Sequence, residues 1–209
     1  MPHDITGSSS KEHLLSDSPP DAPASEAIEY KTVVFRSGLH GGITEYQGPG
    51  AQVNDRWENL YNAFGVSLID KDSARRLPNA TTPLPQNRSL YVVQLDVFHQ
   101  LHCLNRLRKL LYPQVYHIDI SSGSDEAVDT LYHLEHCVES LRQSLQCASD
   151  TSTIFWEWSP ANSKMMGNTA TTHTCRNFER IRDWAIRHKL DGDFDMLVKV
   201  EGAPIRQEG

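Results

Sequence analysis

One short pattern occurs twice in this chain of 209 residues, and it constrains the fold more than any other feature. Residues 98–103 read FHQLHC and residues 132–137 read YHLEHC, so a shift of 34 positions places histidine on histidine and cysteine on cysteine. Apolar residues recur around each copy at the spacing of a helix face. We therefore expect two central amphipathic helices, over 90–112 and 127–147, that face each other.

The histidines lie on a different side of each predicted helix from its apolar stripe. At about 100° per residue, the His-His-Cys triplet falls roughly opposite that stripe in both copies. The histidines then either point into solvent or converge on a second, polar centre. The two stripes consist of Val97, Leu101, Leu104, Leu107 and Leu111 in the first helix and Leu131, Leu134, Val138, Leu141 and Leu145 in the second.

The histidine spacing within each copy suits a metal ion. Positions i and i+3 share a helix face, with Cβ atoms about 5–6 Å apart, so His99 can pair with His102, and His133 with His136. Four neutral imidazoles suit copper, zinc, iron or nickel. Structural zinc prefers closely spaced cysteine pairs and a di-iron site needs bridging glutamates, neither of which the repeat provides. We expect one or two copper ions, with these four histidines as metal ligands and catalytic residues.

The four cysteines leave three roles open: metal-bound thiolates, free thiols or two disulfides. The symmetry of the repeat favours a Cys103–Cys137 disulfide, which leaves Cys147 with Cys175. His173 precedes Cys175 by two positions in the segment THTC. It is either a further metal ligand or a surface histidine beside a disulfide.

Composition predicts one folded domain between two poorly ordered ends. Residues 1–29 are rich in serine, proline and aspartate and contain no aromatic residue, which is typical of a disordered tail. A single catalytic domain is expected over 30–201, followed by a frayed C-terminus at 202–209.

Outside the repeat, the sequence predicts short elements. Strands are expected at 31–36 and 150–160, a helix capped by Asp55, an exposed loop at 77–89, and a last helix at 175–189. The fold class is therefore mainly α with a few short strands (α+β).

Charge and sequons bear on partners and location. The formal net charge of −7 argues against a nucleic-acid partner. Asn79 and Asn87 begin glycosylation sequons, which with disulfides would indicate the secretory lumen or secretion. No apolar run of ~18 residues exists to form a transmembrane segment, and no signal peptide is visible. A soluble cytoplasmic location is the alternative unless an anchor or signal was removed.

Three segments together resemble the UstYa-like family of fungal proteins, whose signature is a doubled His-x-x-His-Cys motif. They are LDVFHQLHCLNRLR, YHLEHCVESLRQSLQCASD and THTCRNFERIRDWA, and the resemblance extends from about Tyr46 to about Ala185. It implies a copper- and O2-dependent oxidase of mycotoxin or ribosomal-peptide biosynthesis, with the four motif histidines as essential ligands. It also implies an N-terminal membrane anchor, which the polar residues 1–29 do not provide.

The resemblance implies C–H functionalisation of a small-molecule or peptide substrate: oxidative cyclisation, hydroxylation, desaturation or halogenation. Phe98 and Tyr132 flank the ligands and are either walls of a substrate pocket or residues of the core. Arg108 and Arg142 either anchor an anionic group or pair with acids. The alternative function is a non-redox cyclase or isomerase that uses the histidines as acid and base. A non-catalytic accessory protein is a third possibility, and a homo- or heterodimer is a further expectation.

Overall fold

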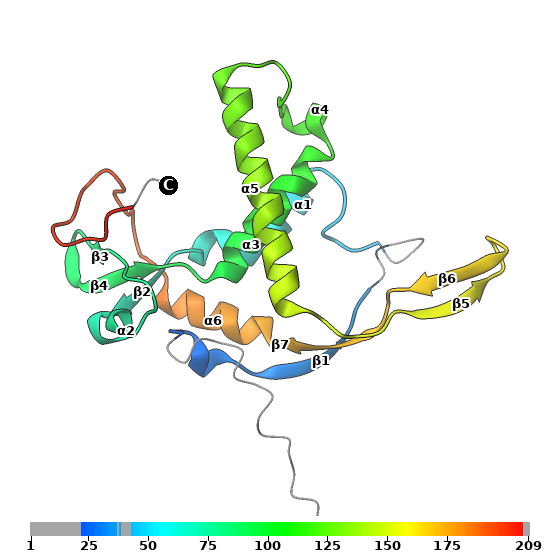
Figure 1. Cartoon of the computed structure of the whole chain (residues 1–209), viewed down its shortest axis with the longest axis horizontal. Coiled ribbons are helices and arrows are strands. Elements are labelled where there is room, and N and C mark those ends of the chain that lie inside the picture. Colours follow the sequence, from blue (N-terminus) through cyan, green and yellow to red (C-terminus); the bar gives the residue numbers. More distant parts are fainter. Residues whose placement is uncertain (1–21, 37, 39–42, 207–209) are drawn as a thin grey trace, which may run out of the picture.

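A computed structural model describes residues 22–36, 38 and 43–206 of the chain and confirms the predicted α+β class (Figure 1). The helices are α1 (Ala51–Tyr61), α2 (Lys71–Arg75), α3 (Asp96–Leu110), α4 (Pro113–Tyr116), α5 (Asp125–Ala148) and α6 (Phe178–His188), with 3₁₀ turns η1 (Ser25–Ala27) and η2 (Asn62–Phe64). The strands are β1 (Tyr30–Val34), β2 (Ser67–Asp70), β3 (Pro83–Leu84), β4 (Asn87–Val93), β5 (Phe155–Ser159), β6 (Lys164–Asn168) and β7 (Thr172–Arg176).

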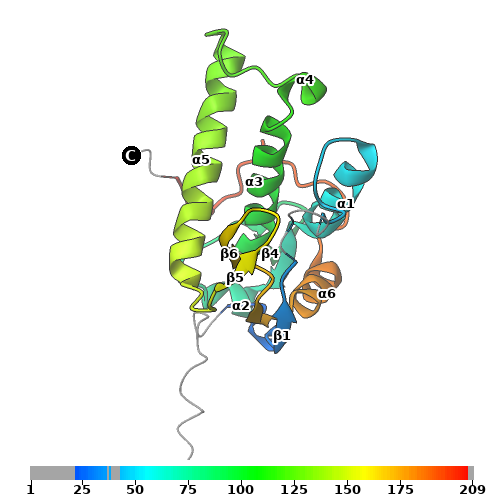
Figure 2. The same cartoon turned by 90° about the vertical axis from the view of Figure 1, so that its right-hand side faces the viewer.

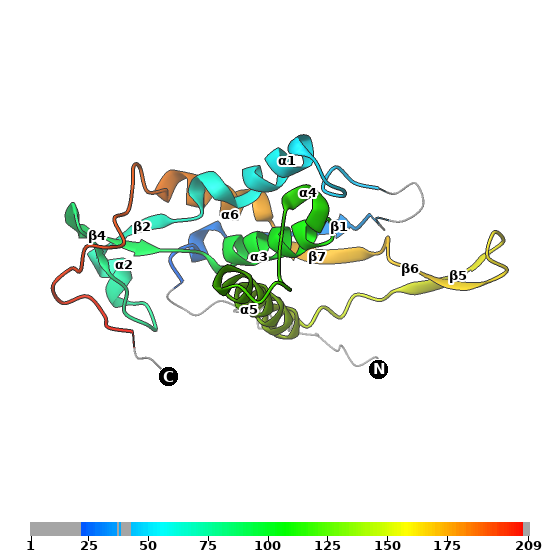
Figure 3. The same cartoon turned by 90° about the horizontal axis from the view of Figure 1, so that it is seen from above.

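The two repeat helices pack against each other, but they occupy different places in the fold. Helix α3 lies in the middle, with α5 on one side and α1 on the other (Figure 2). Seen from above, α5 forms one outer edge of the molecule, while α1 and α6 lie on the far side of α3 (Figure 3). Over the residues that the structure describes, no helix is long and apolar enough to span a membrane.

The hydrophobic core forms where α3 meets η2 and α6. Phe98 is fully buried and contacts Phe64 and Phe178 edge to face, at ring-centroid distances of 5.2 and 6.2 Å. Ala24 and Ala27, at η1, also belong to this core. Residues 22–29 of the predicted tail are therefore part of the fold, whereas residues 1–21 lie outside the described residues.

The strands form three small antiparallel sheets. Strands β2, β4 and β3 make one sheet, with Ser67 opposite Val93, and β1 pairs with β7, with Val33 opposite His173. The third sheet is the β5–β6 hairpin, which projects away from the helices (Figure 1). Strand β5 falls within the strand predicted at 150–160, whereas β6 was not predicted.

Three predicted helix starts are wrong. The helix predicted from residue 90 begins at Asp96, because 87–93 pairs with β2 and β3 as strand β4. The helix predicted from residue 175 begins at Phe178, because 172–176 pairs with β1. Asp55 lies inside α1 rather than at its cap. The capping position is Gly50, whose φ of +110° is one that glycine adopts readily.

The predicted apolar stripes are buried only in part. Val97 and Leu101 pack against the core, and Leu134 is buried on α5. The remaining members that are clearly exposed are Leu104, Leu111, Leu131, Val138 and Leu145. The buried residues of α3 are instead Phe98, Cys103, Asn105 and Arg108.

Candidate metal centre

Charged residues stabilise the ends of α3, and a capping serine stabilises the start of α5. Asp96 in the first turn of α3 and Arg108 and Lys109 in its last turn complement the helix dipole. Helix α5 begins at Ser124, whose side-chain oxygen accepts a hydrogen bond from the Ala127 N–H at 3.2 Å. The short helix α4 and a loop connect them, and α5 then runs back across α3 at an angle (Figure 1).

The structure brings the four motif histidines together across this helix pair. His99 Nε2 lies 3.4 Å from His136 Nε2. The ring centroids of His102 and His133 are 6.1 Å apart, and those of His133 and His136 are 6.4 Å apart. Because the helices run in opposite directions, the first histidine of each copy faces the second histidine of the other. The histidines therefore pair between the two helices, and not only within one turn of the same helix.

Two cysteines lie beneath the histidines. Cys103 and Cys137 are both fully buried, and the Cys103 Sγ is 3.6 Å from His99 Nε2. The ligand atoms of His99, Cys103 and His136 all lie within 4.8 Å of one another. Burial and the neighbouring Cys137 thiol raise the pKa of Cys103 to about 12. With no metal bound, Cys103 is therefore a neutral thiol at physiological pH.

All four cysteines are free thiols in the structure, so neither predicted disulfide is formed in it. The Cys137 thiol is one cause of the raised pKa of Cys103, and Cys147 and Cys175 line one cavity. The two disulfides stay predictions.

The environment of two of the four histidines, His102 and His133, favours the neutral imidazole. Burial lowers the pKa of His102 and of His133, and the positive charge of Arg106 lowers both further. A neutral imidazole is the form that binds a metal ion. His133 and His136 are exposed on α5, whereas His99 and His102 are partly covered, so the centre is open toward the surface.

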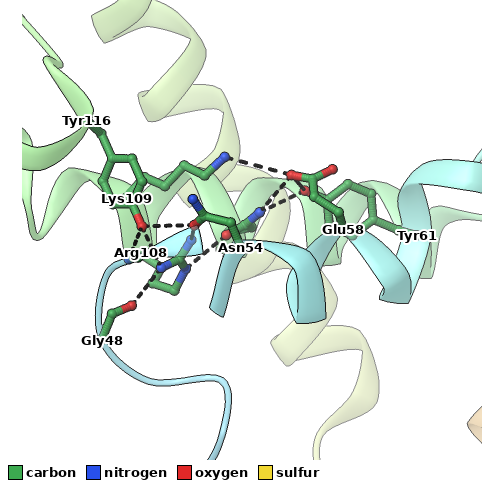
Figure 4. A network of polar contacts seen from close by, with 9 residues as sticks. Gly48, Asn54, Glu58, Tyr61, Arg108, Lys109 and Tyr116 are labelled. Carbon is green, nitrogen blue, oxygen red and sulfur yellow. Dashed lines mark hydrogen bonds and ion pairs between the residues drawn. The ribbon is translucent and has the colours of Figure 1, made fainter. Parts of the chain in front are cut away.

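Two of the predicted pocket residues have structural roles instead. Phe98 is in the core and lines no substrate pocket. Arg108 is also buried. Its guanidinium donates hydrogen bonds to Asn54 Oδ1 at 2.6 Å, Gly48 O at 2.7 Å and Asn105 Oδ1 at 2.9 Å. Figure 4 shows this network, which ties α3 to α1 and to the loop before it. Arg108 is therefore no anchor for substrate.

The other two predicted pocket residues are on the surface of α5. Tyr132 is exposed. Arg142 is half-exposed and forms an ion pair with Glu139, with Nε 2.7 Å from Oε2. Of the two roles expected for Arg142 from the sequence, the structure shows the pairing with an acid.

His173 does not join the four histidines. Its Nδ1 lies 2.7 Å from Asp150 Oδ2, and its ring stacks on Phe35 at 3.6 Å. Asp150 follows the end of α5, 14 residues after His136, which is about 20 Å along a helix. The prediction that His173 completes the metal site is therefore not supported by its position.

The two predicted glycosylation sites are exposed. Asn79 lies in a loop and Asn87 begins β4, where its Oδ1 accepts a hydrogen bond from the Ser89 N–H at 3.1 Å. Glycosylation of either residue stays a prediction.

Two cavities lie beside the centre. One, of about 530 Å³, is bordered by His102, Tyr61, Arg106 and Leu134. The other, of about 1070 Å³, is lined by Asp96 and by residues of α5, β1 and β7, with none of the four histidines in its wall. The first cavity therefore opens directly onto the centre.

Sequence reasoning missed two neighbours of the centre. The Tyr61 ring lies edge-on to His102 at 5.6 Å, and Arg106 acts electrostatically on His102 and His133. Arg106 had a usable signal, because it follows His102 by four positions and so lies one turn along the same helix face. Tyr61 had none, because it comes from α1, whose contact with α3 the sequence does not reveal.

Comparison with known proteins identifies the family. The family profile described as "Mycotoxin biosynthesis protein UstYa" matches residues 4–188. No solved structure matches this chain.

Individual relatives are fungal oxidases and a hydroxylase. The UstYa family oxidase phomYc′ of Diaporthe leptostromiformis is 36% identical over 105 residues, covering 48% of this chain and 41% of the relative. The UstYa family oxidase aprY of Aspergillus flavus is 29% identical over 197 residues, covering 84% of this chain and 58% of the relative. The hydroxylase cctR of Talaromyces islandicus is 28% identical over 148 residues, covering 69% and 53%.

This chain thus spans about half the length of these relatives. The family profile nevertheless covers both copies of the His-x-x-His-Cys motif, the helices that carry them and the strand that follows. The chain belongs to the UstYa family of mycotoxin biosynthesis proteins.

Proposed function

We propose that this chain is a copper-dependent oxidoreductase of secondary-metabolite biosynthesis that uses O2 to functionalise C–H bonds. The names of the relatives, oxidases and a hydroxylase, support the oxidative class. The observation that carries the proposal is the approach of His99 Nε2 to within 3.4 Å of His136 Nε2, from two helices, beside a second cross-helix histidine pair.

The donor set fits copper. Imidazole nitrogens are good ligands for copper, zinc and iron. The nearest carboxylate found at His99 is that of Asp96, with Oδ1 3.8 Å from Nδ1, and a single carboxylate does not make the bridging set of a di-iron site. Zinc fits the nitrogens equally well but has no redox chemistry, which an oxidase requires. When bound, copper supplies one-electron exchange and reactivity toward O2.

The protein residues have separable roles in this proposal. His99, His102, His133 and His136 hold the ion or ions, and the buried thiols of Cys103 and Cys137 fill the space beneath them. Tyr61 and Leu134 form part of the cavity wall next to His102 and orient a small-molecule or peptide substrate. The shape of that wall decides between cyclisation, hydroxylation, desaturation and halogenation.

Metal analysis of the purified, reconstituted chain tests the proposal. We expect one or two copper ions per chain, and more than ~10-fold weaker copper binding for His102→Ala and for His136→Ala. His173→Ala is the matched control, because it removes an imidazole that lies outside the cluster, and it should bind copper as the unmodified chain does. Substoichiometric copper in the unmodified chain, or unchanged binding in His102→Ala and His136→Ala, would contradict the proposal.

A non-redox cyclase or isomerase is the second candidate. The pKa values of His102 and His133 are lowered, which favours their neutral form. A neutral imidazole can act as a general base, as this second function requires. Turnover of a pathway intermediate in the absence of O2 and in the presence of a chelator would select this function. Turnover that requires both copper and O2 would reject it.

A further inference from the structure

One guanidinium beside the candidate centre, that of Arg106, forms no ion pair or hydrogen bond with the residues that the structure describes. Arg106 lies on α3, one turn after His102, and it is partly buried in the wall of the 530 Å³ cavity. Within the part of the chain that the structure describes, no carboxylate lies within ion-pair distance of it and no acceptor takes a hydrogen bond from its side chain. We propose that this cavity binds the substrate through a carboxylate group held by Arg106. This inference rests on the proposed function, because it concerns the substrate of that centre.

The other charges around the cavity are already engaged. Lys109 Nζ lies 3.7 Å from Glu58 Oε1 and over the Tyr116 ring at 5.8 Å. Glu58 also lies 3.4 Å from the Asn105 amide and from the Tyr61 hydroxyl, both of which donate to it (Figure 4).

Two further carboxylates border the cavity. Asp119 accepts hydrogen bonds from the backbone N–H groups of Ser121 and Ser122, at 2.9 and 3.1 Å. Glu126 lies in the first turn of α5, where the positive end of the helix dipole stabilises it. The charge of Arg106 is therefore the one in this wall that an incoming anion would neutralise.

The chemistry of the group selects a carboxylate. A guanidinium presents parallel N–H donors that match the two oxygens of a carboxylate. Partial burial strengthens such a bond, because fewer water molecules compete for the donors. A cavity of this volume accommodates a small molecule or the end of a short peptide.

The position of Arg106 also fixes where the substrate would react. One helical turn separates it from His102, a rise of about 6 Å. A carboxylate held at Arg106 therefore brings carbon atoms a few bonds away from it next to the four histidines. This geometry suits a peptide C-terminus or a compact carboxylic acid whose reactive C–H bond lies a few bonds from the carboxylate.

The larger cavity is less suited to such a substrate. Its wall contains none of the four histidines. A substrate held there would not reach the centre through that wall.

Ligand binding to the metal-free full-length chain tests the inference. Benzoate and benzamide are the probes, since they share shape and differ in charge, and the absence of metal prevents the carboxylate from binding an ion directly. We expect titration calorimetry or ligand-observed NMR to show benzoate binding at least ~10-fold tighter than benzamide. In Arg106→Gln the preference for benzoate should disappear. In Arg106→Lys part of it should remain, because lysine keeps the positive charge but loses the two parallel N–H donors of the guanidinium.

Arg88→Gln is the matched control, because Arg88 is exposed on β4 and lines neither cavity. It should bind benzoate as the unmodified chain does. Equal binding of benzoate and benzamide by the unmodified chain, no detectable benzoate binding, or unchanged preference in a folded Arg106→Gln would overturn the inference.

Copper binding by the same variants separates this inference from the proposed function. If Arg106→Gln keeps both its copper and its benzoate preference, the carboxylate site is wrong and the metal centre stands. If His102→Ala and His136→Ala keep their copper while Arg106→Gln loses the preference, the metal centre is wrong and the anion site stands.

Discussion

Helices α3 and α5 carry the same motif, yet equivalent positions have opposite environments. Phe98 of α3 is fully buried, whereas Tyr132, its counterpart on α5, is 67% exposed. Arg108 is 7% exposed, whereas the side chain of its counterpart Arg142 is 50% exposed. The cysteines of the two copies, in contrast, share one environment, since Cys103 and Cys137 are both fully buried.

The difference follows from what each helix touches. Helix α3 contacts α1, α5 and the core around Phe64, whereas α5 packs mainly against α3 (Figures 2 and 3). The two cysteines lie where each copy contacts the other and are buried alike. Phe98 and Arg108 contact elements other than α5, and there the burial of the two copies differs.

The largest expected contrast is between Phe98→Ala and Tyr132→Ala. Removing the Phe98 ring leaves a cavity among Phe64, Phe178 and Trp184 and should lower the free energy of unfolding by about 3–5 kcal/mol. Removing the exposed Tyr132 ring should change it by less than ~0.5 kcal/mol. Chemical denaturation of both variants measures the contrast, and similar losses would mean that α5 has a burial partner comparable to that of α3.

The second contrast is between Arg108→Met and Arg142→Met. Loss of the Arg108 guanidinium leaves the Asn54 and Asn105 side-chain oxygens and the Gly48 carbonyl without this donor, which should destabilise the protein by about 2–3 kcal/mol. Arg142 and Glu139 are solvent-exposed, so Arg142→Met should leave the unfolding midpoint within experimental error. Equal shifts in the two midpoints would contradict the structural role assigned to Arg108.

The third prediction concerns the positions where the copies match. Cys103→Ala and Cys137→Ala should each destabilise the reduced protein by about 1–2 kcal/mol, since each removes a fully buried sulfur. Because the two thiols are neighbours, the double variant should lose less than the sum of the single variants. Strict additivity in this double-mutant cycle would show that the two side chains do not interact.

The smallest effect is expected at the end of α5, where Asp150 links it to β7 through His173. Hydrogen bonds from Ser152 and from His173 lower the pKa of Asp150 to about 2. The folded-state pKa lies below the unfolded value of about 3.9, so this carboxylate contributes stability above about pH 4 that is lost as the pH falls toward 2.

Asp150→Asn should therefore flatten part of the decline in melting temperature between pH 4 and pH 2. The matched control is Asp191→Asn, in an exposed carboxylate that pairs with Lys189 outside this region. If the melting temperatures of Asp150→Asn and of the unmodified chain decline identically between pH 4 and pH 2, the link between Asp150 and His173 does not anchor α5.

The sequence allowed the two central helices and the clustering of their histidines to be predicted, because both depend on local periodicity and on one helix contact. It misled at β4, where Leu90, Tyr91, Val92 and Val93 continue the apolar pattern of the helix but pair as a strand. It also left open whether Phe98 and Arg108 line a pocket or have structural roles. Which side of α3 is buried depends on α1 and α6, which approach from distant parts of the chain and leave no trace in the periodicity.

All four histidines come from one uninterrupted stretch of chain, residues 99–136, whereas β1 can pair with β7 only when residue 172 and beyond are available. Contacts that are close in sequence form faster than distant ones, because closing a short loop loses less entropy. The helical hairpin that carries the imidazoles can therefore form before the sheet that joins the two ends of the domain closes. For the proposed function, this means that the metal ligands can come together before the rest of the fold is complete.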